Sequence, residues 1–239
     1  MNLNLLRNKL VLAMALMTTG TLSSFSQQES TIVTVTENTF VSQQDPSTVQ
    51  NGGRDLGVAI DQSKGDSRET YLKFDITALV GKGGLVDANL SIEASVKQEA
   101  PWTPIPDFFL NIYACTKAWS ATTLTWGNKV EADPTLIAEA DIKQEALYVL
   151  KGTAADNTGI KKAVEDAMKK HSQFVSFVLK GKEETAGSRI WVSSDKWIGA
   201  TLNVVQDFYL DEPGATGTYI TSIKVKGFND WSKCRQPGM

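Results

Sequence analysis

The 239-residue sequence has few of the residues on which disulfide frameworks, zinc sites and catalytic triads depend, because it contains two cysteines and one histidine. Cys115 and Cys234 cannot build a framework of several disulfides, and no cysteine or histidine spacing indicates zinc. The sequence leaves open whether these two cysteines pair with each other. No nucleophile elbow, metalloprotease helix or phosphate loop is present. The sequence therefore predicts a protein that is not an enzyme.

Basic residues are not in excess either. Lysine and arginine together number 24 against 27 acidic residues, which gives a formal net charge of −3. A chain that binds nucleic acid normally carries a basic surplus, because it must neutralise phosphates. Nucleic acid is therefore not an expected partner.

Long apolar runs are missing as well, and the short run Leu10–Met17 cannot span a bilayer. Arg7 and Lys9 precede it, and a small polar stretch ending at Ser26 follows it. This order of charge, apolar run and small residues is typical of a secretory signal peptide. We therefore expect residues 1–26 to be a signal peptide, no membrane span, and a mature protein that is secreted, extracellular or at the cell surface.

Most of the remaining chain alternates apolar and polar residues in short segments bounded by Gly, Asn, Asp and Pro. This pattern predicts an all-β fold, an antiparallel jelly-roll-like β-sandwich, over residues 27–209. The expected strands are Thr31–Thr36, Asp55–Asp61, Thr70–Asp75, Ala88–Val96, Phe108–Cys115, Ala146–Leu150, Gln173–Lys180, Arg189–Ser193 and Ala200–Tyr209.

One segment shows helical spacing instead. Apolar residues recur at intervals of three and four from Ile160 to His171, and Asp156–Thr158 ahead of them can cap a helix start. We expect one short helix that closes one end of the sandwich. Residues 211–217 have linker composition, and Tyr219–Phe228 alternates like one more strand. Residues 210–239 are therefore predicted to be a linker and tail, with the start of a truncated further domain favoured over an added edge strand.

Two strings are more specific than strand propensity requires: Tyr71–Asp75, which reads YLKFD, and Trp119–Trp126, which reads WSATTLTW. Together with Val175–Gly181 they resemble the DNRLRE-type carbohydrate-binding modules of secreted bacterial polysaccharide-degrading proteins. The resemblance implies a non-catalytic module that binds an extracellular polysaccharide and targets an attached enzyme or the cell surface to it. Some members bind acidic polysaccharides such as alginate through basic residues after the first strand, whereas Ser42–Asp61 holds Arg54 as its one cation.

The physical interpretation of the two strings agrees with the resemblance. Leu72 and Phe74 lie on one face of a strand and are expected in the core, while Lys73 lies on the other. Trp119 and Trp126 suit structural anchors, because each large aromatic buries about 150–250 Å².

The candidate ligand-binding residues are cations and indoles in or beside predicted turns: Arg54, Arg68, Trp102, Arg189, Trp191 and Lys196. Arginine can grip a carboxylate or sulfate through two hydrogen bonds, and Trp102 is carried on a loop stiffened by three prolines. Scattered surface charge explains the cations equally well, and Trp102 could instead plug the sandwich edge. No cofactor is established, and a structural calcium ion on Glu37, Asn38 and Asp207 is left open.

Two functions follow from these residues. The first is binding of a polysaccharide, with an anionic one such as alginate or ulvan among the candidates, through stacking on indoles and charge-assisted hydrogen bonds. The alternative is a structural or adhesive cell-surface module that binds protein or cell-wall partners. An apolar or flat edge without cations near an exposed tryptophan would favour the alternative.

Overall fold

The computed structural model describes residues 26–50, 55–60, 65–96, 107–182, 189–193 and 199–209. The chain divides into two compact units, of which Ser26–Phe208 contains almost all of these residues. The predicted tail, residues 210–239, and all but the last residue of the predicted signal peptide lie outside the described residues.

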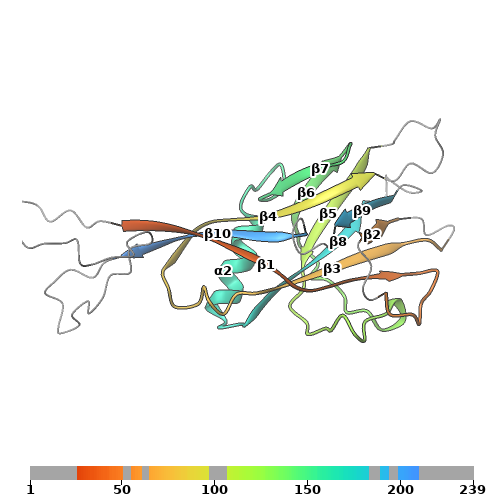
Figure 1. The fold of residues 1–239 in the computed structure, drawn as a ribbon, viewed down its shortest axis with the longest axis horizontal. Coiled ribbons are helices and arrows are strands. Elements are labelled where there is room, and N and C mark those ends of the chain that lie inside the picture. The colour runs from red at the N-terminus through yellow and green to blue at the C-terminus, as the bar shows by residue number, and fades with distance from the viewer. Residues whose placement is uncertain are drawn as a thin grey trace, which may run out of the picture. The chain divides into compact units, whose positions relative to one another are not determined.

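The described unit consists of β-strands with one α-helix, so the predicted all-β class is confirmed (Figure 1). Its elements in chain order are β1 (Ser26–Ser42), β2 (Asp55–Ala59), β3 (Arg68–Asp75), β4 (Gly84–Val96), β5 (Phe108–Ala114), η2 (Trp126–Asn128), β6 (Leu136–Ile142), β7 (Ala146–Leu150), α2 (Gly159–Lys169), β8 (Phe174–Gly181), β9 (Arg189–Ser193) and β10 (Thr201–Tyr209). The strand β6 has no counterpart among the predicted strands.

The strands pair along the path β1-β10-β4-β9-β2-β3-β8-β5-β6, with β7 beside β4 and β1 also paired with β3. The path bends back on itself and forms a sandwich. One layer is β6-β5-β8-β3-β1, and the other contains β7, β4, β2 and the two strands β9 and β10, which both pair with β4. The first strand begins next to the end of β10 (Figure 1).

The core lies between the layers and takes alternate residues from each strand, as the period of two requires. Leu72 and Phe74 of β3 are fully buried there, as predicted. The helix α2 contributes Ile160 and Val164, both 0% exposed. Burying one such side chain stabilises the fold by about 1.5–3 kcal/mol. The apolar spacing of the helical segment is therefore explained by packing against the sandwich.

The start of α2 differs from the expected cap. Thr158 occupies the N-cap position, but its side chain makes no capping hydrogen bond. Asp156 instead accepts hydrogen bonds from the Thr158 amide at 3.1 Å and the Thr158 hydroxyl at 2.6 Å. Hydrogen bonds from Lys162 and Thr158 lower the pKa of Asp156 to about 2.

A second, smaller core lies on the outer face of β3 and β8. Residues 115–132, here called the corner segment, cover Tyr71 and Val178 there. Trp119 is 8% exposed and Trp126 packs against the same cluster, so both are structural anchors as predicted. Cys115 is a free thiol buried in this cluster, and Cys234 lies outside the described residues. Burial raises the pKa of this thiol.

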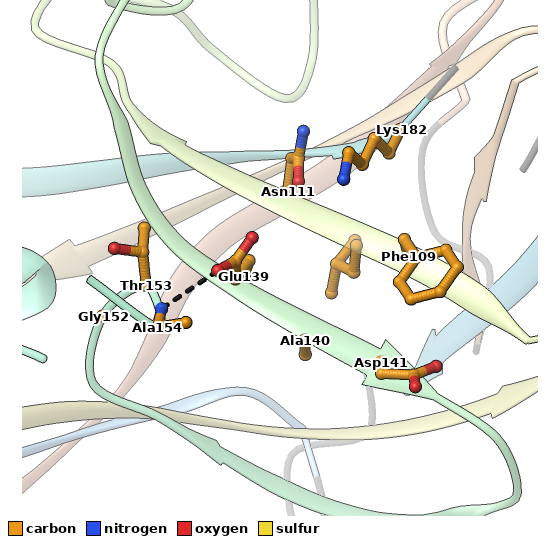
Figure 2. A pocket seen from close by; sticks show the side chains of 10 residues that line it. Phe109, Asn111, Glu139, Ala140, Asp141, Gly152, Thr153, Ala154 and Lys182 are labelled. Carbon is orange, nitrogen blue, oxygen red and sulfur yellow. Dashed lines mark hydrogen bonds between the residues drawn. The ribbon is translucent and has the colours of Figure 1, made fainter. Parts of the chain in front are cut away.

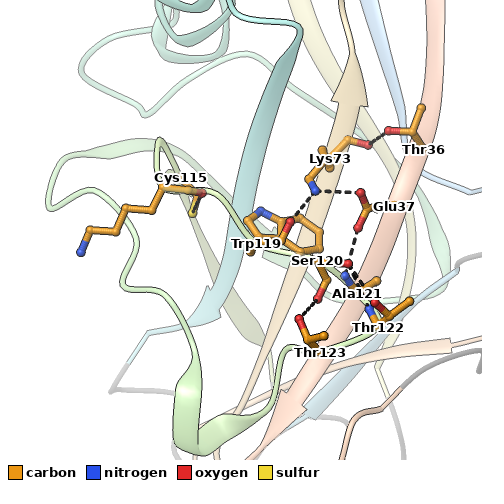
Figure 3. A network of polar contacts seen from close by, with 10 residues as sticks. Thr36, Glu37, Lys73, Cys115, Trp119, Ser120, Ala121, Thr122 and Thr123 are labelled. Carbon is orange, nitrogen blue, oxygen red and sulfur yellow. Dashed lines mark hydrogen bonds and ion pairs between the residues drawn. The ribbon is translucent and has the colours of Figure 1, made fainter.

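A polar network ties the corner segment to the layer beneath it (Figure 3). Lys73 donates to the Trp119 carbonyl oxygen at 2.6 Å and to Glu37 of β1. Its ammonium group also lies 4.4 Å from the centre of the Trp119 ring. Lys73, the lysine of the YLKFD string, is therefore a structural residue that binds the WSATTLTW segment through Trp119.

Candidate functional site

Three of the six predicted ligand-binding residues come together. Arg68 begins β3, while Arg189 and Trp191 lie on β9, and the strand β2 lies between them. Ala59 of β2 pairs with both Arg68 and Arg189. The other three, Arg54, Trp102 and Lys196, lie outside the described residues.

Asp66 joins the two arginines. Its Oδ1 is 3.1 Å from the Arg68 guanidinium, and its Oδ2 is 3.1 Å from that of Arg189. The Arg68 and Arg189 side chains are only 13% and 22% exposed. One carboxylate therefore neutralises part of the charge of this pair and fixes its position.

The indole of Trp191 is also engaged. The Arg68 guanidinium carbon lies 5.7 Å from the centre of this ring, within cation–π range. The neighbouring strand β2 has Gly57 paired with Trp191, and this glycine leaves room for the contact between the Arg68 and Trp191 side chains. A Cβ atom at Gly57 would lie 3.1 Å from Arg68 Cδ and 3.4 Å from Trp191. Phe40 meets the indole edge-on at 6.4 Å. Trp191 thus orients Arg68, and Arg68 and Phe40 already cover part of the Trp191 ring.

Arg68 also lines a pocket of about 430 Å³, here called the basic pocket. Two further cations, Lys129 and Lys180, line it together with the indole of Trp126. The remaining lining residues are Gln43, Ala59, Ile60, Ser67, Glu69 and Gly181. The corner segment supplies Lys129 and Trp126, and the end of β8 supplies Lys180.

One buried carboxylate holds the lysines of the basic pocket in place. Glu69 is 9% exposed and lies 2.5 Å from Lys129 Nζ and 3.3 Å from Lys180 Nζ. It also accepts a hydrogen bond from the Tyr71 hydroxyl at 3.3 Å. Burial and then the charge of Glu69 raise the pKa of Tyr71, so this hydroxyl stays protonated.

The charges of the basic pocket do not cancel. Four cations, Arg68, Arg189, Lys129 and Lys180, face the three carboxylates of Asp66, Glu69 and Glu131, which leaves one net positive charge. Each ammonium group has three N–H donors, and Glu69 does not use them all. Lys129 Nζ lies 3.7 Å from the centre of the Trp126 ring. The arrangement therefore presents fixed donors and positive charge beside an aromatic surface.

Sequence reasoning missed Lys129 and Lys180, and it assigned Trp126 an anchoring role alone. The signal that could have found Lys180 is its alternation with Val178, which places both on the outer face of β8. Lys129 follows Trp126 by three residues, but only the path of the corner segment brings it to Glu69.

The described residues contain no group of three or more His, Cys, Asp or Glu side chains that could hold a metal ion. Glu37, one of the residues considered for calcium, is bound instead by Lys73 and by the Ala121 amide. Within the same ranges, no helix combines the length and the apolar character that crossing a membrane requires.

Comparison with known proteins bears on this surface. The family model of carbohydrate-binding module family 96 matches residues 29–204. No protein with a curated description matches the chain. Among solved structures, the chain is similar to the CBM22-1 and GH10 modules of the N-terminal endo-1,4-β-D-xylanase 10B of Clostridium thermocellum, complexed with xylohexaose. The identity is 10% and the TM-score 0.20, over 81% of this chain and 30% of that chain. A likeness of this degree says nothing about the ligand.

Proposed function

Since this chain belongs to carbohydrate-binding module family 96, we propose that it binds an anionic extracellular polysaccharide at the basic pocket. Carbohydrate-binding modules are non-catalytic domains, so the chain is a carbohydrate-binding protein and not an enzyme. The anionic ligand is the part that goes beyond the family. It is supported by one observation: Arg68, Lys129 and Lys180 converge on a single pocket with Trp126.

The chemistry of the pocket suits an acidic sugar. A uronate carboxylate or a sulfate accepts charge-assisted hydrogen bonds from ammonium and guanidinium groups. The C–H faces of a sugar ring are apolar and can contact an indole such as that of Trp126. Each partly exposed ion pair contributes only about 0–1 kcal/mol, so several sugars and several cations have to act together.

The proposal extends to the location of the module and to the partners that it targets. We propose that residues 1–26 direct secretion and that the module targets an attached enzyme or the cell surface to the polysaccharide. The DNRLRE-type assignment belongs to the same proposal. Its support is the match of YLKFD and WSATTLTW, which in the folded chain meet through Lys73 and Trp119.

Affinity electrophoresis against alginate, ulvan, pectin and a neutral glucan tests the anionic ligand. We expect at least one acidic polysaccharide to retard the protein at low salt, and retardation to fall as salt screens the charges. The double variant Lys129→Ala and Lys180→Ala should lose about 10-fold or more in affinity, which corresponds to about 1.4 kcal/mol.

The matched control is Lys169→Ala with Lys170→Ala, which removes the same charge from the end of α2. Circular dichroism checks that both double variants fold, and Lys129→Gln, which keeps a polar side chain beside Glu69, serves if the first does not. Native-like binding by the pocket variants, or no retardation by any acidic polysaccharide, would overturn the proposal.

A protein-binding role is the second candidate, and one observation favours it. Leu147 and Val149 on β7 are 66% and 56% exposed, and β7 pairs with β4 alone among the described strands. Such an apolar edge suits a protein partner. Leu147→Asp would then weaken adhesion or cell binding and leave polysaccharide binding unchanged, whereas the reverse result would exclude this role.

A further inference from the structure

A second pocket, of about 470 Å³, lies on the outer face of β5 and β6 and is here called the β5–β6 pocket (Figure 2). It shares no lining residue with the basic pocket. The side chains that matter for its chemistry are Phe109, Asn111, Glu139, Asp141, Thr153 and Lys182.

The strand register places these groups on one surface. Phe109 pairs with Asp141 across β5 and β6, and Asn111 pairs with Glu139. Directly opposed residues of an antiparallel pair have their Cβ atoms about 4.5–5.5 Å apart and point to the same face. An aromatic ring, an amide and two carboxylates therefore form a compact two-by-two array.

The ring of Phe109 is available to a ligand. Phe109 is 37% exposed, while its neighbours Phe108 and Leu110 are completely buried. Large apolar side chains exposed to this degree are few among the described residues. Lys182 Nζ lies 5.8 Å from the ring centre. A rigid strand thus holds an aromatic surface towards solvent at the rim of a pocket.

The polar groups beside the ring are held in place by hydrogen bonds and still have unused acceptor atoms. The Glu139 Oε1 atom accepts the Ala154 amide at 3.0 Å, which fixes the carboxylate (Figure 2). Its second oxygen has no partner among the residues that the structure describes. Asn111 Nδ2 donates to the Tyr113 hydroxyl at 3.3 Å. The side-chain oxygen of Asn111, Oδ1, is likewise unpartnered within the described ranges. Both oxygens can accept hydrogen bonds from sugar hydroxyls.

We propose that the β5–β6 pocket is a second carbohydrate-binding site, selective for neutral sugars. One face of a pyranose ring lies on Phe109, and vicinal hydroxyls donate to Glu139 and Asn111. Of the two carboxylates on the lining, Asp141 is paired with Lys143, whose Nζ lies 2.9 Å from Asp141 Oδ2, while Glu139 forms no ion pair within the described residues. An acidic sugar would meet the like charge of Glu139 there, whereas a neutral sugar offers hydroxyl donors to this carboxylate.

The inference rests on the carbohydrate binding of the family and not on the basic pocket. Its test compares two sets of variants by calorimetry or affinity electrophoresis with the full chain. Each set should lose one class of ligand and keep the other. The probes are neutral β-glucan and xylan oligosaccharides, chitosan oligosaccharides, and the acidic polysaccharide that the native protein binds best. Phe109→Ala should lower affinity for a neutral oligosaccharide at least 10-fold and change affinity for the acidic polysaccharide less than 2-fold. Glu139→Gln should give a smaller loss in the same direction.

Two controls separate this site from other effects. Phe174→Ala removes another exposed ring, 36% exposed, and should leave neutral-sugar binding unchanged. The double variant of Lys129 and Lys180 should lose the acidic ligand and retain the neutral one. The inference is overturned if the native protein binds no neutral oligosaccharide, if it binds chitosan fragments alone, or if Phe109→Ala binds neutral sugar like the native protein. Each of these results leaves the proposed function at the basic pocket standing.

Discussion

Lys73 and Glu37 form an ion pair between β3 and β1, with Nζ 2.8 Å from Oε1. The second carboxylate oxygen of Glu37 accepts the Ala121 amide at 3.0 Å, while Lys73 also holds the Trp119 carbonyl. Both partners of the pair therefore hold the corner segment, which in turn carries Trp126 and Lys129 to the basic pocket.

Replacing Lys73 by Met should destabilise the protein. The change keeps most of the unbranched apolar part of the side chain but leaves Glu37 and the Trp119 carbonyl oxygen without their shared donor. Because the Glu37 side chain is 36% exposed, we expect a loss of about 1–3 kcal/mol in the free energy of unfolding, below the cost of a fully buried pair. Urea denaturation measures it. Lys169→Met, at a side chain 66% exposed, should change it by about 0.5 kcal/mol or less. Equal effects would contradict the structural role of Lys73.

The same pair predicts how stability depends on pH. Burial alone would raise the pKa of Glu37, but hydrogen bonds from Lys73 and Ala121 and the charge of Lys73 outweigh it and hold the pKa below 4.5. The folded state therefore binds the proton less readily than the unfolded state. The stability that Glu37 contributes is present above pH 4.5 and is lost as the pH falls through the folded pKa.

Urea denaturation between about pH 6 and pH 3 checks this. The native protein should lose more stability on acidification than Glu37→Gln, and the two proteins should converge at the acidic end. If plots of the free energy of unfolding against pH stay parallel for the two proteins, Glu37 has the same pKa in the folded and unfolded states, and the prediction is wrong.

Removing the carboxylate between the two arginines should strengthen binding of an acidic polysaccharide. Asp66→Asn keeps the shape of the side chain and removes the carboxylate charge that pairs with Arg68 and Arg189. We expect affinity at low salt to rise about 2- to 5-fold, the size of one partly exposed ion pair, with a steeper dependence on salt. Asp156→Asn makes the same change in net charge beside α2 and serves as the control. An equal gain in both variants would mean that overall charge alone is responsible.

Gly159 is needed where α2 approaches β6. A Cβ atom there would lie 1.8 Å from the Ile137 carbonyl oxygen, so Gly159→Ala must move the helix and disturb Ile160 and Val164. We expect a loss of about 2–4 kcal/mol in the free energy of unfolding. Gly84→Ala is the control, because nothing lies within 4 Å of its added Cβ, and it should stay within about 0.5 kcal/mol. Thermal and urea denaturation of both variants compare them.

The period-two pattern predicted most strands and missed β6 for a physical reason. The sequence of Leu136–Ile142 is LIAEADI, in which alanine and acidic residues replace the β-branched and aromatic residues that mark a strand. The segment becomes a strand because it pairs with β5, where Leu110 and Ile112 lie opposite Ala140 and Ala138. Pairing over a long sequence distance is not visible in local propensity.

The candidate site was predictable in part for the same reason. Cations near indoles pointed to Arg68, Arg189 and Trp191, and these do meet. What brings them together is the register of β2, which pairs Gly57 with Trp191 and Ala59 with both arginines. Lys129 and Lys180 could not be assigned, since their common neighbour Glu69 is defined only by the path of the corner segment over the sheet.

The adjacency of β1 and β10 determines how this module can be joined to other proteins. Arg68 pairs with Ser42, the last residue of β1, whereas the 17-residue strand β1 starts at its other end beside the end of β10. At about 3.3 Å per residue, that strand places the start of β1 and the end of β10 roughly 50 Å from the end that carries the basic pocket. A partner fused at either point would lie at the end opposite the proposed binding site and would leave that site open.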